Sequence, residues 1–127
     1  MRSIWKTVLA GVAGMGIGVI GTQVYAQQTK PLPAYIIAEQ EILDPSAAQQ
    51  YRAGVGPTLA AAGAHTLVSG GKTDPIDGAP PKRIAVIAFD SAAAARAWHD
   101  GPSRMALEPL QNKAMNERAF IVEGVAP

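Results

Sequence analysis

The segment Arg83–Phe89 (RIAVIAF) carries an apolar side chain at every position after its first, and no other feature constrains the fold as much. Side chains alternate between the two faces of a β-strand. One face of this strand would therefore carry Ile84, Val86 and Ala88, and the other Ala85, Ile87 and Phe89. Both faces need a cover, because a large exposed apolar face marks an interface.

Two segments before Arg83 also have the pattern of strands. Ala34–Gln40 alternates, with Tyr35, Ile37 and Glu39 on one face and Ala34, Ile36 and Ala38 on the other. His65–Ser69 predicts a second, shorter strand. Gly70–Pro81 (GGKTDPIDGAPP) is rich in glycine and proline, and it predicts a long irregular connection between the second and third strands.

A helix is predicted between the first two strands. Asp44 is a typical N-cap residue, and Pro45 follows it at the first helical position. The helix would run from Pro45 towards Ala62 and end at Gly63, a typical left-handed terminator. Pro57 removes a backbone donor, so we expect an interruption or kink near residues 54–57.

The C-terminal part predicts two more helices and a last strand. The first helix is capped by Asp90 or Ser91 and runs through His99, and Gly101-Pro102 ends it. The second helix runs from Ser103 through about Asn116. The last strand is Ala119–Val125. The order is β-α-β-β-α-β, the ferredoxin-like arrangement of an α+β sandwich with an antiparallel sheet. Its helices cover one sheet face only, so the second apolar face of Arg83–Phe89 predicts face-to-face dimerisation into an α+β barrel.

The first 26 residues have the pattern of a signal peptide. Arg2 and Lys6 supply a positive start, Val8–Gly21 contains no charge, and Val24 and Ala26 occupy the small-residue positions of a cleavage site. We expect cleavage after Ala26, which leaves residues 27–33 as a tether and 34–127 as the domain of a periplasmic or secreted protein. The alternative is an uncleaved anchor helix, which would be the protein's only contact with a membrane.

Composition excludes several classes of site. The chain has no cysteine, which rules out disulfides, a thiolate nucleophile and thiolate metal ligands. Without Arg2 and Lys6, nine basic residues face ten acidic ones, so the mature chain carries a formal charge of −1. These charges are scattered, whereas nucleic-acid binding needs a concentrated basic patch. We therefore expect no nucleic-acid partner.

Residues 34–125 resemble the family called domain of unknown function 1330. The resemblance rests on the stretches AYIIAEQEILDPSAAQQYRAGVGPTLAAAGAHTLVSGGK and RIAVIAFDSAAAARAWHDGPSRMALEPLQNKAMNERAFIVEGV. That family belongs to the dimeric α+β barrel superfamily, whose members include cofactor-free monooxygenases, lactone isomerases and some haem enzymes. The resemblance implies a ferredoxin-like fold and a homodimer, and its motifs are specific for a fold rather than for a reaction.

His99 and Arg104 are the first candidates for a site. The family's usual turn has a second aromatic where this chain has His99, tyrosine where it has Arg104, and arginine where it has Gln111. A histidine at a helix C-terminus is stabilised as a cation, so His99 is either a general acid or base or a surface C-cap. Arg104 is either an anion-binding group at a pocket rim or a solvated helix arginine.

Aromatic residues supply the other candidates. Tyr51 matches a tyrosine that recurs in the family, and it is either a catalytic acid or a core residue with a wetted hydroxyl. Arg52, Trp98 and Tyr35 are candidate ligand-binding residues. We expect a pocket between the sheet and the helices, near the turn Trp98–Arg104, because that turn joins two helix ends and lies over a rigid sheet.

No metal or cofactor is expected. His65 is isolated, so we expect it to be structural or exposed, and no HxH or HxxxH spacing is present. Haem would need an axial ligand in a large cavity, for which a 101-residue mature domain has little room. Gly70-Gly71-Lys72 lacks the strand-to-helix context of a phosphate loop.

Three classes of function remain open from the sequence. The resemblance implies a cofactor-free enzyme, like a monooxygenase or an isomerase, in which His99 and Tyr51 act on a small organic molecule. The second class is a non-catalytic binding or accessory module that uses the same pocket. The third is a structural dimer whose interior is filled by its own side chains.

Overall fold

A computed structural model describes residues 30–127 of the protein. The predicted signal segment and most of the tether lie outside this range, so they stay predictions. The elements are β1 (Ala34–Ile42), α2 (Pro45–Ala61), β2 (His65–Ser69), β3 (Arg83–Phe89), α3 (Ala92–Asp100), α4 (Pro102–Met105), α5 (Glu108–Ala114) and β4 (Met115–Glu123). None of these four helices is long and apolar enough to cross a membrane.

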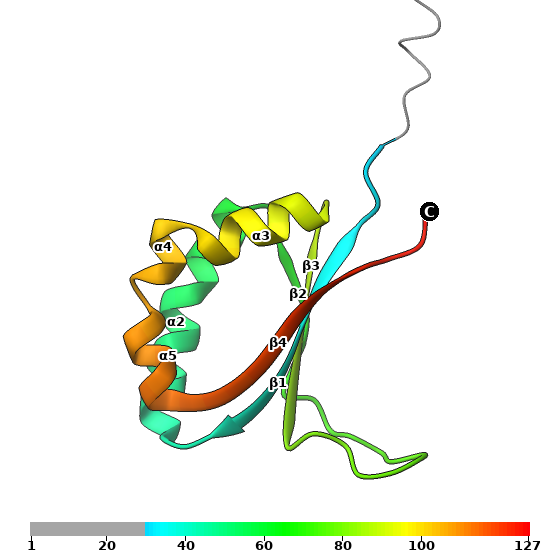
Figure 1. Ribbon diagram of the computed structural model, residues 1–127. Helices are drawn as coiled ribbons and strands as arrows, with labels where there is room; N and C mark the ends of the chain where they lie inside the picture. The colour runs from blue at the N-terminus through cyan, green and yellow to red at the C-terminus, as the bar shows by residue number, and fades with distance from the viewer. Residues whose placement is uncertain (1–29) are drawn as a thin grey trace, which may run out of the picture. The chain divides into compact units, whose positions relative to one another are not determined.

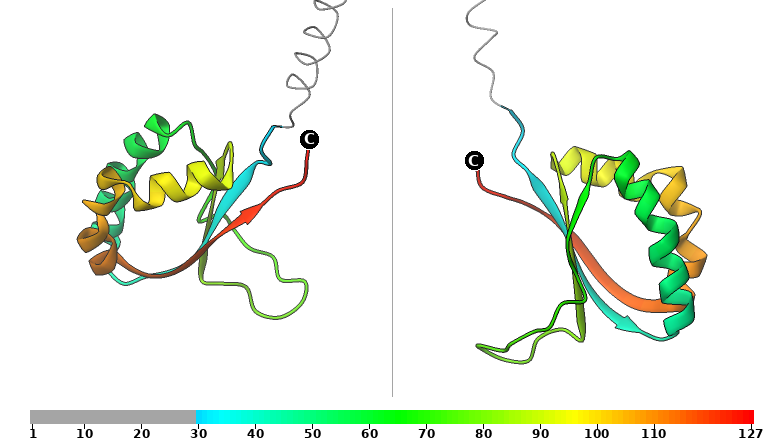
Figure 2. Two further views of the ribbon diagram at one scale, coloured as in Figure 1. Left: turned by 45° about the horizontal axis from the view of Figure 1, so that its top comes forward. Right: turned by 180° about the vertical axis from the view of Figure 1, so that it is seen from behind.

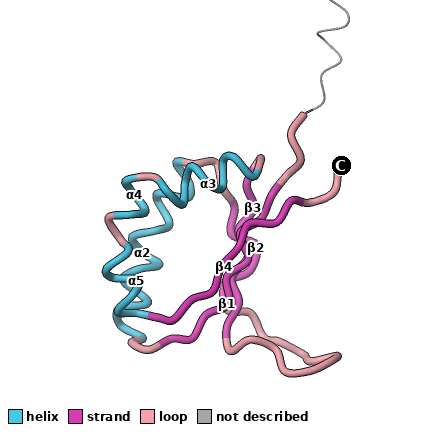
Figure 3. The backbone as a smooth tube through the Cα atoms, in the orientation of Figure 1, coloured by secondary structure: helices cyan, strands magenta, loops and turns pink. Residues whose placement is uncertain are grey.

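The four strands form one antiparallel sheet in the order β2-β3-β1-β4. Helices α2, α3, α4 and α5 all lie on the same side of this sheet, and none of them covers its other side (Figures 1 and 2). The predicted ferredoxin-like α+β fold is confirmed. The connection between β2 and β3 is irregular, as expected, and it extends away from the sheet (Figure 3).

Helix α2 begins and ends as predicted, but it is not interrupted. Asp44 Oδ1 accepts a hydrogen bond from Ala47 N at 3.1 Å, and Gly63 after the helix has a φ of 69°. The expected break near Pro57 is wrong, since the helix is continuous through it. Pro57 lies in the last two turns, where one missing donor costs little compared with the burial of Leu59 beyond it.

The predicted helix from Ser103 to Asn116 is also wrong in its extent. It consists of two short helices, α4 and α5, and it ends at Ala114. Pro109 in the first turn of α5 lacks the N–H that would continue α4. Strand β4 then begins at Met115 rather than Ala119, because residues 115–118 pair with the end of β1. At the start of α3, Ser91 rather than Asp90 is the cap, accepting from Ala94 N at 3.1 Å.

Three rows of side chains cross the helix-facing side of the sheet. Because β3 and β4 both pair with β1, each row joins one residue from each strand. The rows are Ile87–Ile36–Ile121, Ala85–Ala38–Ala119 and Arg83–Gln40–Glu117. The isoleucine row packs into one core cluster with Leu59, Phe89 and Ala95. The alanine row is too short to reach the helices above it, and this leaves space inside the domain.

Candidate functional site

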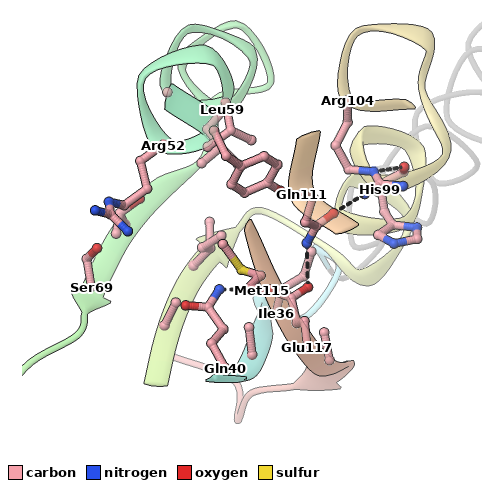
Figure 4. A pocket seen from close by; sticks show the side chains of 18 of the residues that line it. Ile36, Gln40, Arg52, Leu59, Ser69, His99, Arg104, Gln111, Met115 and Glu117 are labelled. Carbon is pink, nitrogen blue, oxygen red and sulfur yellow. Dashed lines mark hydrogen bonds between the residues drawn. The ribbon is translucent and has the colours of Figure 1, made fainter. Parts of the chain in front are cut away.

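A cavity of about 180 Å³ lies between the sheet and the helices (Figure 4). The alanine row forms part of its floor, the isoleucine row lies to one side of that floor, and the polar row Arg83–Gln40–Glu117 lies to the other. The helices contribute the remaining wall: Tyr51, Arg52, Val55, Gly56, Leu59, Trp98, His99, Arg104 and Gln111. Three arginines and one glutamate line the cavity, so its wall carries a net positive charge.

A second, more polar chamber of about 240 Å³ adjoins the first. The two share His99, Arg104, Gln111, Met115, Glu117 and Ala119. Glu108 and Asn112 complete the second chamber. The shared residues therefore form a boundary between an apolar compartment and a polar one.

A chain of hydrogen bonds runs along the cavity from one end to the other. Glu117 Oε2 accepts from Gln40 Nε2 at 2.7 Å, and Glu117 Oε1 accepts from Gln111 Nε2 at 2.9 Å. The carbonyl of Gln111 accepts from Arg104 Nη1 at 3.0 Å, and that of Gln40 accepts from Arg83 Nη1. Figure 4 shows Gln111 reaching from the helices towards Glu117 on the sheet. This network fixes the orientation of both amides, because each carbonyl faces an arginine and each NH₂ faces the carboxylate.

Tyr51 is the buried phenol of this site, only 7% exposed, and it projects from α2. Its pKa is raised to about 12, mainly by burial and to a smaller extent by the Glu117 carboxylate, while Arg104 acts in the opposite direction. A phenol with such a pKa stays protonated at neutral pH. Tyr51 can therefore donate a hydrogen bond to a ligand, but it cannot act as a general base.

The raised pKa of Tyr51 predicts a loss of stability at high pH. The unfolded phenol ionises near 10 and the folded one near 12, so the native state holds its proton more tightly. The free energy of unfolding should fall as pH rises from about 10 to about 12, by roughly 1.4 kcal/mol per unit at most. Urea denaturation across this window should show a shallower pH dependence for Tyr51→Phe than for the wild type; equal slopes would contradict the assignment.

Trp98 and His99 lie at the end of α3, and both line the cavity. Trp98 Nε1 donates to Thr58 Oγ1 at 3.0 Å, and its ring packs against Phe89 with centroids 5.8 Å apart. His99 Nδ1 lies 2.9 Å from Asp100 Oδ1, and this hydrogen bond lowers the pKa of Asp100. His99 therefore has one nitrogen engaged outside the cavity, and only Nε2 is left for a ligand.

Arg104 is buried, with 3% of its surface exposed, so the interpretation as a solvated helix arginine is wrong. Its Nε donates to the backbone oxygen of His99 at 2.5 Å, and Nη1 donates to Gln111. Its Nη2 lies 3.1 Å from the sulfur of Met105 and 3.4 Å from Glu108 Oε1. With these partners Arg104 ties α3, α4 and α5 together, and few of its donors remain for a ligand.

The remaining predicted residues fall on different sides of the sheet. Arg52 projects from α2 and lines the cavity at the end opposite Arg104 and His99 (Figure 4). Tyr35 pairs with Ala88 and Val122 on the face that carries no helices, so the structure does not bring it to the cavity. His65 is exposed.

The polar row was not predicted, although the sequence held a signal for it. Gln40 continues the helix-facing series Ala34, Ile36, Ala38, and Arg83 continues the series Phe89, Ile87, Ala85. A polar residue at the end of an apolar alternation marks the edge of a core. Glu117 could not be recognised as part of this row, because the last strand was predicted to begin at Ala119, two residues after it.

Within residues 30–127, no group of three or more His, Asp and Glu side chains is placed to hold a metal ion.

Comparisons with known proteins agree with this fold. The family described as "Domain of unknown function (DUF1330)" matches residues 33–125, so the chain belongs to that family. A search among curated proteins found no match.

Three solved structures share the architecture. The crystal structure of RPA0582, a protein of unknown function from Rhodopseudomonas palustris, has a TM-score of 0.62 at 15% identity, covering 85% of this chain and 93% of that one. Methylated RPA0582 gives 0.61 at 14% identity, covering 85% and 91%. SnoaB, a cofactor-independent oxygenase from Streptomyces nogalater, gives 0.50 at 7% identity, covering 76% and 96%. Identities this low show a common fold and nothing more.

Proposed function

We propose that this member of the domain of unknown function 1330 family binds a small organic molecule in the cavity over its alanine row. The observation that carries the proposal is the cavity itself, in which apolar side chains surround a few polar groups. Ligand sites commonly combine an apolar lining with a small number of placed hydrogen-bonding groups. Here those groups are the Tyr51 hydroxyl, the Glu117 carboxylate and the arginines of the wall.

The volume limits the ligand to about one aromatic ring. Sites for drug-sized molecules start at roughly 300 Å³, well above the 180 Å³ of this cavity. An apolar cavity of about 150 Å³ is nevertheless large enough to hold benzene. A compound with one ring, or a short branched chain, therefore fits the apolar compartment, with its polar substituents directed to the hydrogen-bonded network.

A cofactor-free reaction is the second candidate, and it is favoured by the presence of Tyr51 and Glu117 in one cavity, where the carboxylate acts electrostatically on the phenol. Glu117 can take a proton from a carbon next to a carbonyl, and the Tyr51 hydroxyl can donate a hydrogen bond to the oxyanion that forms. Return of the same proton at another carbon would complete an isomerisation. His99 Nε2, at the boundary of the two chambers, could deliver or accept that proton instead. The similarity in fold to SnoaB, a cofactor-independent oxygenase, is compatible with this class of chemistry.

Filling the cavity tests the proposal. Ala85→Leu should abolish saturable binding of benzyl alcohol, measured by calorimetry, because the larger side chain projects from the alanine row into the ligand's space. The thermal stability of this variant should stay near that of the wild type, since the new side chain enters an existing void. Ala93→Leu, on an exposed position of α3, is the matched control and should bind normally. Undiminished binding by Ala85→Leu would contradict the proposal.

We also propose a homodimer formed by the sheet face that carries no helices. Ile37, Val86 and Ile84 are half-buried there, and Leu67, Phe120 and Val122 are exposed. Ion pairs between Arg118 and Glu39 and between Lys82 and Glu41 border the apolar part at one end. An apolar face with a charged rim has the composition of a protein interface.

Export is the third part of the proposal. The basic start, the uncharged Val8–Gly21 and the Val24–Ala26 site support a cleaved signal peptide and a periplasmic or secreted location. N-terminal sequencing of the exported protein should begin at Gln27. Full-length protein retained in the membrane fraction would contradict this part.

A further inference from the structure

Arg52 and Arg83 lie near one another at the end of the cavity opposite Arg104. Arg52 projects from α2, Arg83 projects from β3, and both line the cavity. The ion pairs found in residues 30–127 involve neither of them, so no carboxylate of this part of the chain lies within 4.0 Å of either guanidinium group. Burial lowers the pKa of Arg83, and the positive charge of Arg52 lowers it further. Two cations that repel one another without a partner constitute a local excess of positive charge.

Arg83 is held in place by neutral groups. Its Nη2 donates to Ser69 Oγ at 3.1 Å, and its Nη1 donates to the carbonyl of Gln40. A Cβ at Gly70 would come within 2.7 Å of Arg83 Nε, so the guanidinium occupies space that only glycine leaves free. The φ of Gly70 is 67°, which also favours glycine. Arg83 is therefore fixed at the cavity wall without being neutralised.

The opposite end of the cavity differs in this respect. Arg104 is held by a backbone oxygen, Gln111 and Glu108, and Glu108 supplies a carboxylate. Glu117 lies between the two ends and is bonded to both glutamines rather than to an arginine. The uncompensated positive charge is thus concentrated at Arg52 and Arg83. Figure 4 shows Arg52 near Ser69, and Arg83 donates a hydrogen bond to the same serine.

We propose that Arg52 and Arg83 form a subsite for the carboxylate of an aromatic or similar planar organic acid, whose apolar body lies over the alanine row. This inference rests on the proposed function, since it specifies the ligand of the same cavity. An arginine matches a carboxylate in geometry, because two parallel N–H groups can face its two oxygens. The Ser69 hydroxyl adjoins the subsite as a further polar group. The ligand would then extend from the arginines towards Tyr51 and Glu117.

The test compares benzoate with benzyl alcohol, which has the same ring and no charge. Calorimetric titration of the wild type at neutral pH should show benzoate binding about tenfold more tightly or better, since charge-assisted hydrogen bonds are the stronger kind. Raising the salt concentration should weaken benzoate binding and leave benzyl alcohol almost unaffected. Arg52→Gln and Arg83→Gln should each reduce the preference for benzoate. Arg96→Gln, which removes an exposed charge from α3, should retain it.

The outcomes separate this inference from the proposed function. Equal affinities of the wild type for the two compounds, or a preference that survives in both variants, would overturn the carboxylate subsite while leaving the cavity a ligand site. Failure of both compounds to bind would overturn the proposed function and the subsite with it. Arg52 is an exposed helix residue, so its variant should fold even if Arg83→Gln does not.

Discussion

Replacing Ile36 with aspartate should unfold the protein, whereas the same replacement at Ile37 should leave a folded monomer. Both residues lie on β1, an interior strand of the sheet. Ile36 is 6% exposed within the core cluster under the helices, and a carboxylate there would be buried without a partner. We expect a loss of about 5 kcal/mol or more, which removes the whole stability of a domain at the low end of the usual range of about 5–15 kcal/mol. Circular dichroism and sedimentation velocity of both variants check this prediction.

The side chain of Ile37 lies on the sheet face that the helices do not cover, which we call the open face. Its neighbours there are Phe120 and Val86. A charge at this position should be solvated in the monomer and should be unpaired in the dimer, so it opposes association rather than folding. Both variants replace one isoleucine with one aspartate. A difference between them in folding or association therefore depends only on which sheet face carries the aspartate. A dimeric Ile37→Asp, or a wild type that sediments as a monomer at micromolar concentration, would contradict the proposed interface.

Truncation of Arg104 should cause the second large effect. Arg104→Ala leaves the backbone oxygen of His99 and the carbonyl of Gln111 without their donor in a buried position. Each unsatisfied group costs about 1–3 kcal/mol, so the two groups predict a loss of roughly 2–6 kcal/mol in the free energy of unfolding. Urea denaturation measures it.

Two control variants show whether the loss of stability comes from the buried hydrogen bonds of Arg104. Arg104→Lys keeps the charge but cannot reach all the partners, so its stability should lie between those of the wild type and Arg104→Ala. Arg96→Ala, at an exposed position of α3, should change stability by less than about 0.5 kcal/mol. If Arg104→Ala is no less stable than Arg96→Ala, the buried arginine does not hold the helices together.

The fold could be predicted because its signals are local and repetitive. Alternating side chains identify the strand Ala34–Gln40, and a continuous apolar run identifies Arg83–Phe89. Asp44, Gly63 and Ser91 mark helix ends through their own backbone chemistry. The boundary between α5 and β4 could not be found in this way. Residues 115–118 become a strand only because they pair with Glu39–Ile42, which are far away in the sequence.

The candidate site was only partly predictable for a related reason. Trp98, His99, Arg104, Tyr51 and Arg52 were chosen by residue type, and all five line the cavity. Tyr35 was chosen in the same way and lies on the other face. The cavity exists because Ala38, Ala85 and Ala119 come into register across three strands, and no single one of these alanines is unusual in the sequence.

We propose the cavity over the alanine row as the binding site of a small organic molecule. The most direct measurement is a titration of isotopically labelled protein with benzoate, followed by amide chemical shifts. Binding in the cavity should produce saturable shifts that are largest at Ala38, Ala85 and Ala119 and at the neighbouring residues of the cavity wall. Shifts confined to the open face around Ile37 and Phe120, or no saturable shift with benzoate or benzyl alcohol, would contradict it.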